Sequence, residues 1–286
     1  MSDRQIVVSR RLLLSLGGAS LLTACGSAAQ ENATPPAAPG TSAPGGAPAQ
    51  PTPAAAASTA AAPSFPSPAP LAAIPEEPEY YVHAGPKELA LTLDDGPSPT
   101  YTPQVLAVLR QYGITATFFV IGANVEKNPD ILRQVVAAGH RVGNHTWSHP
   151  DLGTLSEAQV RSEIERTSEI ITRVGRVRPP TLFRAPGGHF TRTSMAVCAS
   201  LGLNPVAWSV DPVDWSRPGT QAIVDRVLSA AKPGSIILNH DGALLSPGES
   251  EVGGFADRSE TVAALKTYLP RLIDAGYTFT LPDPAR

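Results

Sequence analysis

Cysteine is nearly absent from this sequence of 286 residues, which contains only Cys25 and Cys198. A framework of disulfides, on which small secreted domains often depend, is therefore excluded. Metal sites built from several thiolates are excluded too, which leaves imidazole and carboxylate groups as the available ligands. Cys198 has apolar neighbours in a helical pattern, so we expect it to be a buried, unreactive thiol.

Positive charge is also scarce. The 22 Lys and Arg residues are outnumbered by 25 Asp and Glu residues, and the formal net charge is −3. No run of basic residues interleaved with aromatic ones occurs anywhere in the chain. Such a run is the usual electrostatic footprint of a nucleic-acid-binding protein, so nucleic acid is not an expected partner.

Long hydrophobic runs are missing, and the mostly apolar stretch at 12–22 is too short to span a membrane as a mature helix. It follows Arg10 and Arg11 and ends in small residues before Cys25, a pattern that resembles a bacterial lipoprotein signal. We expect residues 1–25 to be that signal, with Cys25 lipidated and the protein held on the outer side of the membrane. Export by the general or the twin-arginine route stays open, as does ordinary cleavage that leaves Cys25 unmodified.

A proline- and alanine-rich segment follows the signal. Almost half of the 30 prolines fall between residues 35 and 78, among Ala, Gly, Ser, Thr and Gln and with scarcely any large apolar side chain. Such a segment cannot bury enough surface to offset its ordering entropy. We therefore expect a disordered linker at 26–79 and one folded domain at 80–286, a size that suits an α/β barrel or a layered sheet.

Strand and helix patterns alternate through the folded domain. Repeated alternation predicts parallel strands joined by right-handed crossovers, in either a barrel or a doubly wound sheet. In both architectures functional groups gather at the carboxyl ends of the strands. The expected strands are 89–93, 116–121, 141–144, 181–184, 205–209, 235–239 and 277–281, and the expected helices are 102–111, 130–138, 157–174, 220–231 and 260–275.

The helix expected at 157–174 shows how these boundaries are read. Val160, Ile164 and Ile171 mark one buried stripe at helical spacing. Ser156 and Gln159 have the spacing of a capping box at its start. A glycine, Gly175, follows as a stop signal.

Two groups of polar side chains follow predicted strands. Asp94 and Asp95 leave the first strand together, and neighbouring residues at a strand end diverge, so one carboxylate can bind a metal while the other stays free. A turn or helix-capping pair of aspartates is the alternative. His145 and His149 follow the third strand and would share one face if the segment turns helically. Asp95 could then complete a His-His-carboxylate set with open positions for water and substrate.

Five motifs occur in order along the chain, each at the end of a predicted strand. They are Asp94-Asp95, His145-x-x-x-His149, Arg184-x-Pro186-x-Gly188, Asp211-x-x-Asp214-Trp215 and Leu238-x-His240. Together they resemble the motifs of the NodB-homology polysaccharide deacetylases, carbohydrate esterase family 4. The resemblance spans about 87–281 and implies a distorted (β/α)7-type barrel of mainly parallel strands.

The resemblance implies one divalent metal ion, usually zinc and sometimes cobalt or another ion, bound by Asp95, His145 and His149. Asp94 then resembles the general base that takes a proton from the attacking water. His240 resembles the general acid that protonates the departing amine. Considered alone, a single histidine after an apolar strand is more often a hydrogen-bonded core residue.

Supporting roles follow from the same resemblance. Arg184 would orient the base and Asp214 would pair with the acid, although without the motif Arg184 would be interpreted as a surface ion-pair residue. Trp215 and Leu238 would wall the slot for the acetyl methyl group, or be plain core residues. The backbone N–H of Gly187 would donate to the oxyanion. The family often has an aromatic residue here, so the glycines leave the subsite geometry open.

The expected function is hydrolysis of N-acetyl groups on a polysaccharide that contains N-acetylglucosamine. Peptidoglycan is favoured because an anchored enzyme faces its own wall, and chitin-like oligomers are possible. One alternative is an O-acetyl esterase of the acetylxylan type. Another is a non-catalytic sugar-binding lipoprotein, which should have lost at least one of Asp94, Arg184, Asp214 and His240. Besides the polysaccharide and the membrane no partner is expected, and a monomer is favoured.

Overall fold

The computed structural model describes residues 74–83 and 85–282. The expected signal sequence, Cys25 and most of the expected linker lie outside these residues. Glu79, at the linker's expected end, already pairs with the sheet, since its N–H donates to Pro205 O at 2.9 Å and its carbonyl accepts from Ala207 N at 2.8 Å. Within the described residues no helix is long and apolar enough to cross a membrane.

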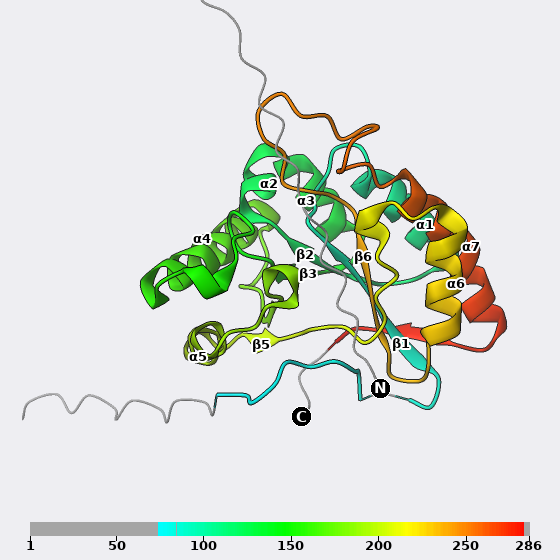
Figure 1. Ribbon diagram of the computed structural model, residues 1–286, viewed down its shortest axis with the longest axis horizontal. Coiled ribbons are helices and arrows are strands. Elements are labelled where there is room, and N and C mark those ends of the chain that lie inside the picture. The colour runs from blue at the N-terminus through cyan, green and yellow to red at the C-terminus, as the bar shows by residue number, and fades with distance from the viewer. Residues whose placement is uncertain (1–73, 84, 283–286) are drawn as a thin grey trace, which may run out of the picture. The chain divides into compact units, whose positions relative to one another are not determined.

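A parallel sheet forms the centre of the described residues (Figure 1). Six strands follow the order β5-β4-β3-β2-β1-β6, and β7 also pairs with β1. The sheet is curled and parallel with helices around it, as in a distorted (β/α) barrel, so the expected fold class is confirmed. The strands are β1 (Glu88–Asp94), β2 (Thr117–Val120), β3 (Arg141–Asn144), β4 (Leu182–Phe183), β5 (Asn204–Pro205), β6 (Ile236–His240) and β7 (Thr278–Thr280).

Helices connect the strands and gather toward the two ends of the sheet (Figure 1). Helix α7 contacts both α1 and α6 at the β1–β6 end, while α4 packs against α2, α3 and α5 toward the β3–β5 end. The helices are α1 (Thr102–Tyr112), α2 (Gly122–Lys127), α3 (Pro129–Ala137), α4 (Glu157–Gly175), α5 (Arg192–Leu201), α6 (Thr220–Ala230) and α7 (Ser259–Asp274).

The amphipathic helices were predicted closely. In α4 the capping box of Ser156 and Gln159 is present and the predicted stripe is fully buried. The expected stop at Gly175 was wrong by one residue, because Arg176 takes the left-handed cap conformation at φ 54°. Cys198 is buried in α5, and burial raises the pKa of its thiol to about 12, so the inert thiol is confirmed.

The short elements were predicted less well. The strand expected at 205–209 is only the two residues of β5, after which the chain leaves the ladder and makes an isolated bridge between Val210 and Ile237. Helix α2 was missed because six residues carry too little periodicity and follow an apolar strand directly.

The core is built around β1, and the position of this strand in the sheet determines which residues lie near its carboxyl end. Leu89, Leu91 and Leu93 are fully buried, as are the β1 residues between them, because parallel strands are covered on both faces. Strand β1 lies between β2 and β6, in register at Asp94 with Phe119 and His240. Residues at the carboxyl ends of β1 and β6 are therefore neighbours.

Candidate metal centre and active site

Asp94 and Asp95 diverge at the end of β1, as the sequence predicted. Asp94 is the last residue of the strand and is buried. Asp95 is left-handed at φ 70°, a conformation that few residues other than glycine adopt, and a cis peptide bond between Gly96 and Pro97 follows. The turn sends the two carboxylates in different directions.

His145 and His149 come together, but not through the helical turn that we considered. Thr146 and His149 are both left-handed, at φ 67° and 53°, so the segment after β3 folds as a tight loop. The N–H of Thr146 donates to Asn144 Oδ1 at 2.9 Å, and the N–H of His149 donates to Thr146 Oγ1 at 3.1 Å. The two imidazole centroids lie 5.0 Å apart. The helical mechanism was wrong, while the expected convergence is observed.

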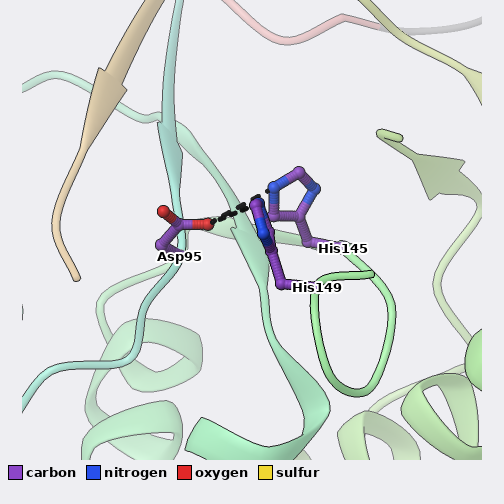
Figure 2. Close-up of side chains that lie close together, drawn as sticks. All are labelled: Asp95, His145 and His149. Atoms are coloured by element: carbon purple, nitrogen blue, oxygen red, sulfur yellow. Dashed lines mark ion pairs between the residues drawn. The ribbon is translucent and has the colours of Figure 1, made fainter. Parts of the chain in front are cut away.

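Asp95, His145 and His149 form the only group of three or more potential metal ligands found among the described residues. Figure 2 shows the carboxylate facing both imidazoles. Asp95 Oδ1 lies 3.4 Å from Nε2 of each histidine. Two ligands about 2.1 Å from a zinc ion, at a tetrahedral angle, lie about 3.4 Å apart. The spacing therefore fits one divalent ion.

Two further observations support that fit. Asp95 Oδ1 is buried and has no hydrogen-bond partner among the described residues, an arrangement that is costly unless a cation is bound. Nδ1 of His145 lies 2.8 Å from the carbonyl oxygen of Arg184. A proton on Nδ1 satisfies that carbonyl and leaves the lone pair of Nε2 free for a metal.

The pKa shifts of the three candidate ligands also bear on metal binding. Burial raises the pKa of Asp95, but the nearby His145, His240 and His149 outweigh it and hold that pKa well below its usual range. Burial lowers the pKa of His149, which favours the neutral, metal-binding form. Burial also opposes protonation of His145, yet Asp94 and Asp95 raise its pKa overall. A bound cation would compete with that proton.

Arg184 is fully buried and holds Asp94, which rules out the surface ion-pair interpretation. Its Nη1 donates to Asp94 Oδ1 at 2.7 Å and to Thr92 Oγ1 at 2.8 Å. Two backbone carbonyls accept its remaining bonds, at Val206 and Ala207. Burial lowers the pKa of Arg184, and Asp94 partly restores it. The other carboxylate oxygen, Asp94 Oδ2, is 3.8 Å from His145 Nε2.

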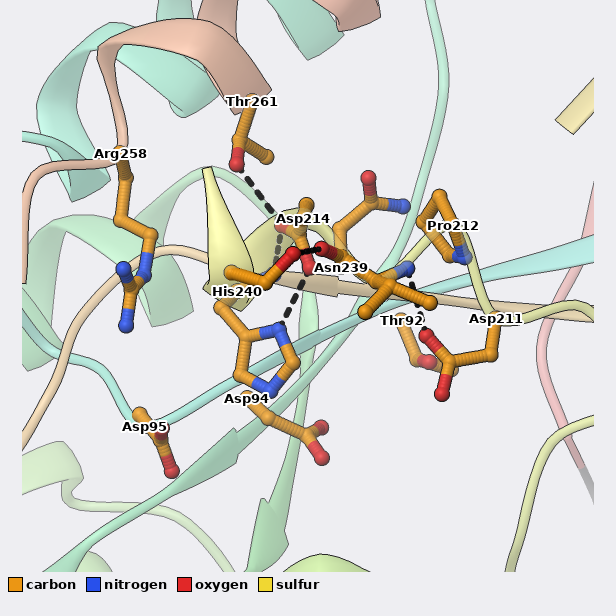
Figure 3. Close-up of polar contacts among 12 residues, drawn as sticks. Thr92, Asp94, Asp95, Asp211, Pro212, Asp214, Asn239, His240, Arg258 and Thr261 are labelled. Carbon is orange, nitrogen blue, oxygen red and sulfur yellow. Dashed lines mark hydrogen bonds and ion pairs between the residues drawn. The ribbon is translucent and has the colours of Figure 1, made fainter. Parts of the chain in front are cut away.

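Asp214 holds His240 in a second buried pair (Figure 3). The two are joined between His240 Nδ1 and Asp214 Oδ1 at 2.7 Å, while Asp214 Oδ2 accepts the N–H of His240 and the hydroxyl of Thr261. Burial lowers the pKa of His240, but Asp214 outweighs it and raises that pKa to about 9. Burial acts the other way on Asp214, whose pKa His240 and Thr261 lower. The pair is ionised at neutral pH.

One cavity of about 880 Å³ is lined by Asp94, Asp95, His145, His149 and His240. Arg184 and Asp214 are not part of its lining. Gly187, Trp215 and Leu238 line it too, as expected. Trp215 is 53% exposed, so it is not a core residue, whereas Leu238 is buried. Gly187 has φ 60°, a conformation that strains any side chain.

Several residues of this cavity were missed from the sequence. Trp208 follows β5, and its ring also packs beside the guanidinium of Arg184. Phe255, 56% exposed, and Arg258 come from the long β6–α7 connection, which has no periodic pattern that marks them. Asp241 lies outside the cavity, directly after His240. Burial raises its pKa to about 7, and within the part of the chain that the structure describes the only hydrogen bond to its carboxylate comes from Thr102.

Known proteins match this chain both in sequence and in structure. Residues 82–206 match the family model for polysaccharide deacetylase. A chitooligosaccharide deacetylase of Sinorhizobium fredii is 44% identical over 68% of this chain and 89% of its own. A peptidoglycan-N-acetylglucosamine deacetylase of Bacillus cereus is 42% identical over 68% and 85%. The crystal structure of the Bc1960 peptidoglycan N-acetylglucosamine deacetylase, in complex with 4-naphthalen-1-yl-N-oxidanyl-benzamide, superposes with a TM-score of 0.62 at 36% identity, over 68% of this chain and 85% of the other.

Proposed function

Since the chain belongs to the polysaccharide deacetylase family, we propose that it is a metal-dependent hydrolase that removes N-acetyl groups from the N-acetylglucosamine units of peptidoglycan. One observation carries the metal dependence: Asp95, His145 and His149 converge with the spacing of ligands around a single cation. A divalent ion held there, zinc in this proposal with cobalt or another ion as substitutes, would polarise the acetyl carbonyl and lower the pKa of a water molecule.

The two groups that transfer protons each belong to one ion pair, Asp94 with Arg184 and His240 with Asp214. Asp94 acts as the general base: Arg184 holds its Oδ1 at 2.7 Å, and the carboxylate lines the cavity where the attacking water must lie. His240 acts as the general acid. With a pKa of about 9 it is protonated at neutral pH, so it can give its proton to the departing amine nitrogen.

The walls of the cavity position the acetyl group. Trp215 and Leu238 offer an apolar slot for its methyl, and the N–H of Gly187 is the proposed donor to the oxyanion. Because Gly187 carries no side chain, this side of the cavity is open to a long polymer.

The N-terminal region is the reason for favouring peptidoglycan. We infer that residues 1–25 are a lipoprotein signal and that Cys25 carries the lipid. The linker that begins at residue 26 and ends before Glu79 would extend the catalytic domain from the membrane toward the wall. Conversion of Cys25 to serine is expected to shift the protein from the detergent-rich to the aqueous phase in detergent phase separation. Unchanged partitioning would contradict the lipid anchor.

The test of function is amine release by the purified protein from peptidoglycan and from N-acetylglucosamine oligomers. We expect activity on both, with peptidoglycan preferred, a loss of at least 100-fold after chelation, and recovery with zinc or cobalt. Activity that survives thorough metal removal would overturn the mechanism. Release of acetate from acetylxylan without amine release from either amide substrate would instead establish the O-acetyl esterase.

The non-catalytic alternative is opposed by the residues themselves. A sugar-binding protein that had lost catalysis would not need Asp94, Arg184, Asp214 and His240 together, and all four are present and paired. Binding of N-acetylglucosamine oligomers without any turnover in the presence of metal would favour it.

A further inference from the structure

The loop that carries the two histidines is held from outside by two helices. It follows β3 and is hydrogen-bonded to residues of α2 and of α4. Its carbonyl groups accept hydrogen bonds from the start of α2, since Gly122 N donates to Thr146 O at 2.9 Å and Ala123 N donates to Trp147 O at 3.0 Å. Helix α2 therefore holds one set of the loop's polar groups.

A single carboxylate on α4 holds the other set. The backbone N–H groups of Trp147 and Ser148 both donate to Glu163 Oε2, each at 2.8 Å. The hydroxyl of Ser148 donates to Glu163 Oε1 at 3.0 Å. Hydrogen bonds to an ionised acceptor are stronger than neutral ones. Glu163 thus binds the two residues in the middle of the interval between His145 and His149.

The rest of α4 closes around the same loop. The guanidinium of Arg166 lies 3.9 Å from the centre of the Trp147 ring. Asn144, just before the first histidine, donates to Ile164 O at 2.7 Å and to Ser168 Oγ at 2.9 Å. The loop is consequently attached to α4 before, within and beside the histidine pair.

The backbone of this loop needs such support. Thr146 and His149 are both left-handed, and that conformation is unfavourable for a β-branched residue such as Thr146. Without its partners on α4 the loop has an easier conformation available, in which the two imidazoles would separate. A metal bound by both would then be held less tightly.

We propose that Glu163 is a positioning residue of the metal centre, which holds His145 and His149 at ligand spacing by fixing the backbone between them. This inference rests on the proposed metal-dependent function. Glu163 is not among the metal ligands, and its effect on the metal passes through the loop.

The experiment measures zinc affinity by competition with a chromogenic chelator. Glu163→Met keeps the length of the side chain and removes every acceptor, and we expect a 10- to 100-fold loss of affinity. Glu163→Gln keeps one acceptor oxygen without the charge and should lose several-fold. Glu169→Met makes the same change at an exposed position two turns along α4 and should bind zinc like the unaltered protein.

Cobalt provides a second readout. The visible absorption of the cobalt-loaded protein reports the geometry around the ion, and it should change in Glu163→Met and stay unchanged in Glu169→Met. A lower melting temperature of metal-free Glu163→Met with unchanged zinc affinity would reveal a merely structural role and overturn the inference. If Glu163→Met does not fold, Glu163→Gln decides, and unaltered affinity in that variant overturns it as well.

Failure of this inference is distinct from failure of the proposed function. If the unaltered protein binds no stoichiometric zinc, the proposed function itself is contradicted. If it binds zinc and Glu163→Met binds it equally well, only the positioning role is lost.

Discussion

Two ion pairs carry the proposed chemistry at the level of single residues. Asp94 with Arg184, and His240 with Asp214, each join a group assigned to proton transfer to a partner of opposite charge. Taking such charges out of water is costly, and each partner offsets part of that cost. In the proposed mechanism Arg184 holds the base in place, while Asp214 raises the pKa of the acid to about 9 and so keeps it protonated at neutral pH.

The variant Asp214→Asn should separate the effect of Asp214 on the pKa of His240 from the effect of burial on that pKa. Without the carboxylate, burial dominates and the pKa of His240 falls from about 9 to its ordinary 6.5 or below. Since a general acid works only while protonated, the alkaline limb of the pH–kcat profile should move from near pH 9 to near or below pH 6.5. The profile with an N-acetylglucosamine oligomer measures this shift.

The same pair predicts a trend in stability. A histidine whose pKa is raised on folding contributes stability that is complete below pH 6.5 and is lost as the pH rises through about 9. Metal-free protein should therefore become easier to unfold across that range, and Asp214→Asn should lose the trend. Asp225→Asn, at an exposed position of α6, is the control for both measurements. If the alkaline limb does not move in Asp214→Asn, Asp214 does not set the pKa of His240 and its proposed role is wrong.

The sequence predicted these residues through the order of motifs rather than through local pattern. Arg184, viewed alone, was interpreted as a surface residue, because a fully buried guanidinium requires acceptors from β1 and from the chain just after β5, which no local window contains. The histidine pair was predicted correctly, but the loop conformation was not. That conformation depends on Glu163 and α2, which lie elsewhere in the chain.

Packing between β2 and β3 supports the base at the scale of elements. Gly143 in β3 leaves room for the ring of Phe119 in β2, since a Cβ on Gly143 would come within 2.5 Å of that ring. The ring of Phe119 also lies near the guanidinium of Arg184, whose central carbon is 4.2 Å from the ring centre. Because Gly143 has no side chain, there is space for the ring of Phe119. That ring lies beside Arg184, which holds Asp94.

Gly143→Ala should disturb this arrangement. The added methyl overpacks a closed site, and we expect about 1–3 kcal/mol of lost stability by urea denaturation, with a lower kcat as Phe119 is pushed against Arg184. In a Phe119→Leu background the same change should cost less, because the smaller side chain gives the methyl room. If Gly143→Ala lowers the stability equally in both backgrounds, the glycine at position 143 is not needed to make room for Phe119.

Long elements were predicted better than short ones, because the short elements depend on residues elsewhere in the chain. Helix α4 has its own stripe and cap, so the sequence was sufficient to predict it. Strands β4 and β5 are two residues each, and they are strands only because neighbouring strands pair with them. The connection between β6 and α7 is held by contacts with distant residues, such as hydrogen bonds from Asn124 to the carbonyl group of Ala243 and from Ser98 to Glu251, and no local pattern encodes these.

At the scale of the whole molecule, one parallel sheet gathers residues that are far apart in the chain. Strand β6, late in the sequence, lies beside β1, the first strand, and this pairing brings His240 next to Asp94. The carboxyl ends of β1, β3, β4 and β6 then meet at one edge, where the cavity lies. Alternating strands and helices predicted such an edge, but only the order of the motifs indicated which residues share it.

The most direct test of the metal centre is a crystal structure of the zinc-loaded protein with anomalous diffraction measured at the zinc absorption edge. We predict one strong anomalous peak within about 2.3 Å of Asp95 Oδ1 and of Nε2 of both His145 and His149, with Asp94 outside the coordination shell. A fully active, zinc-loaded enzyme whose anomalous peak lies elsewhere, or whose Asp95 points away from the two imidazoles, would contradict the account.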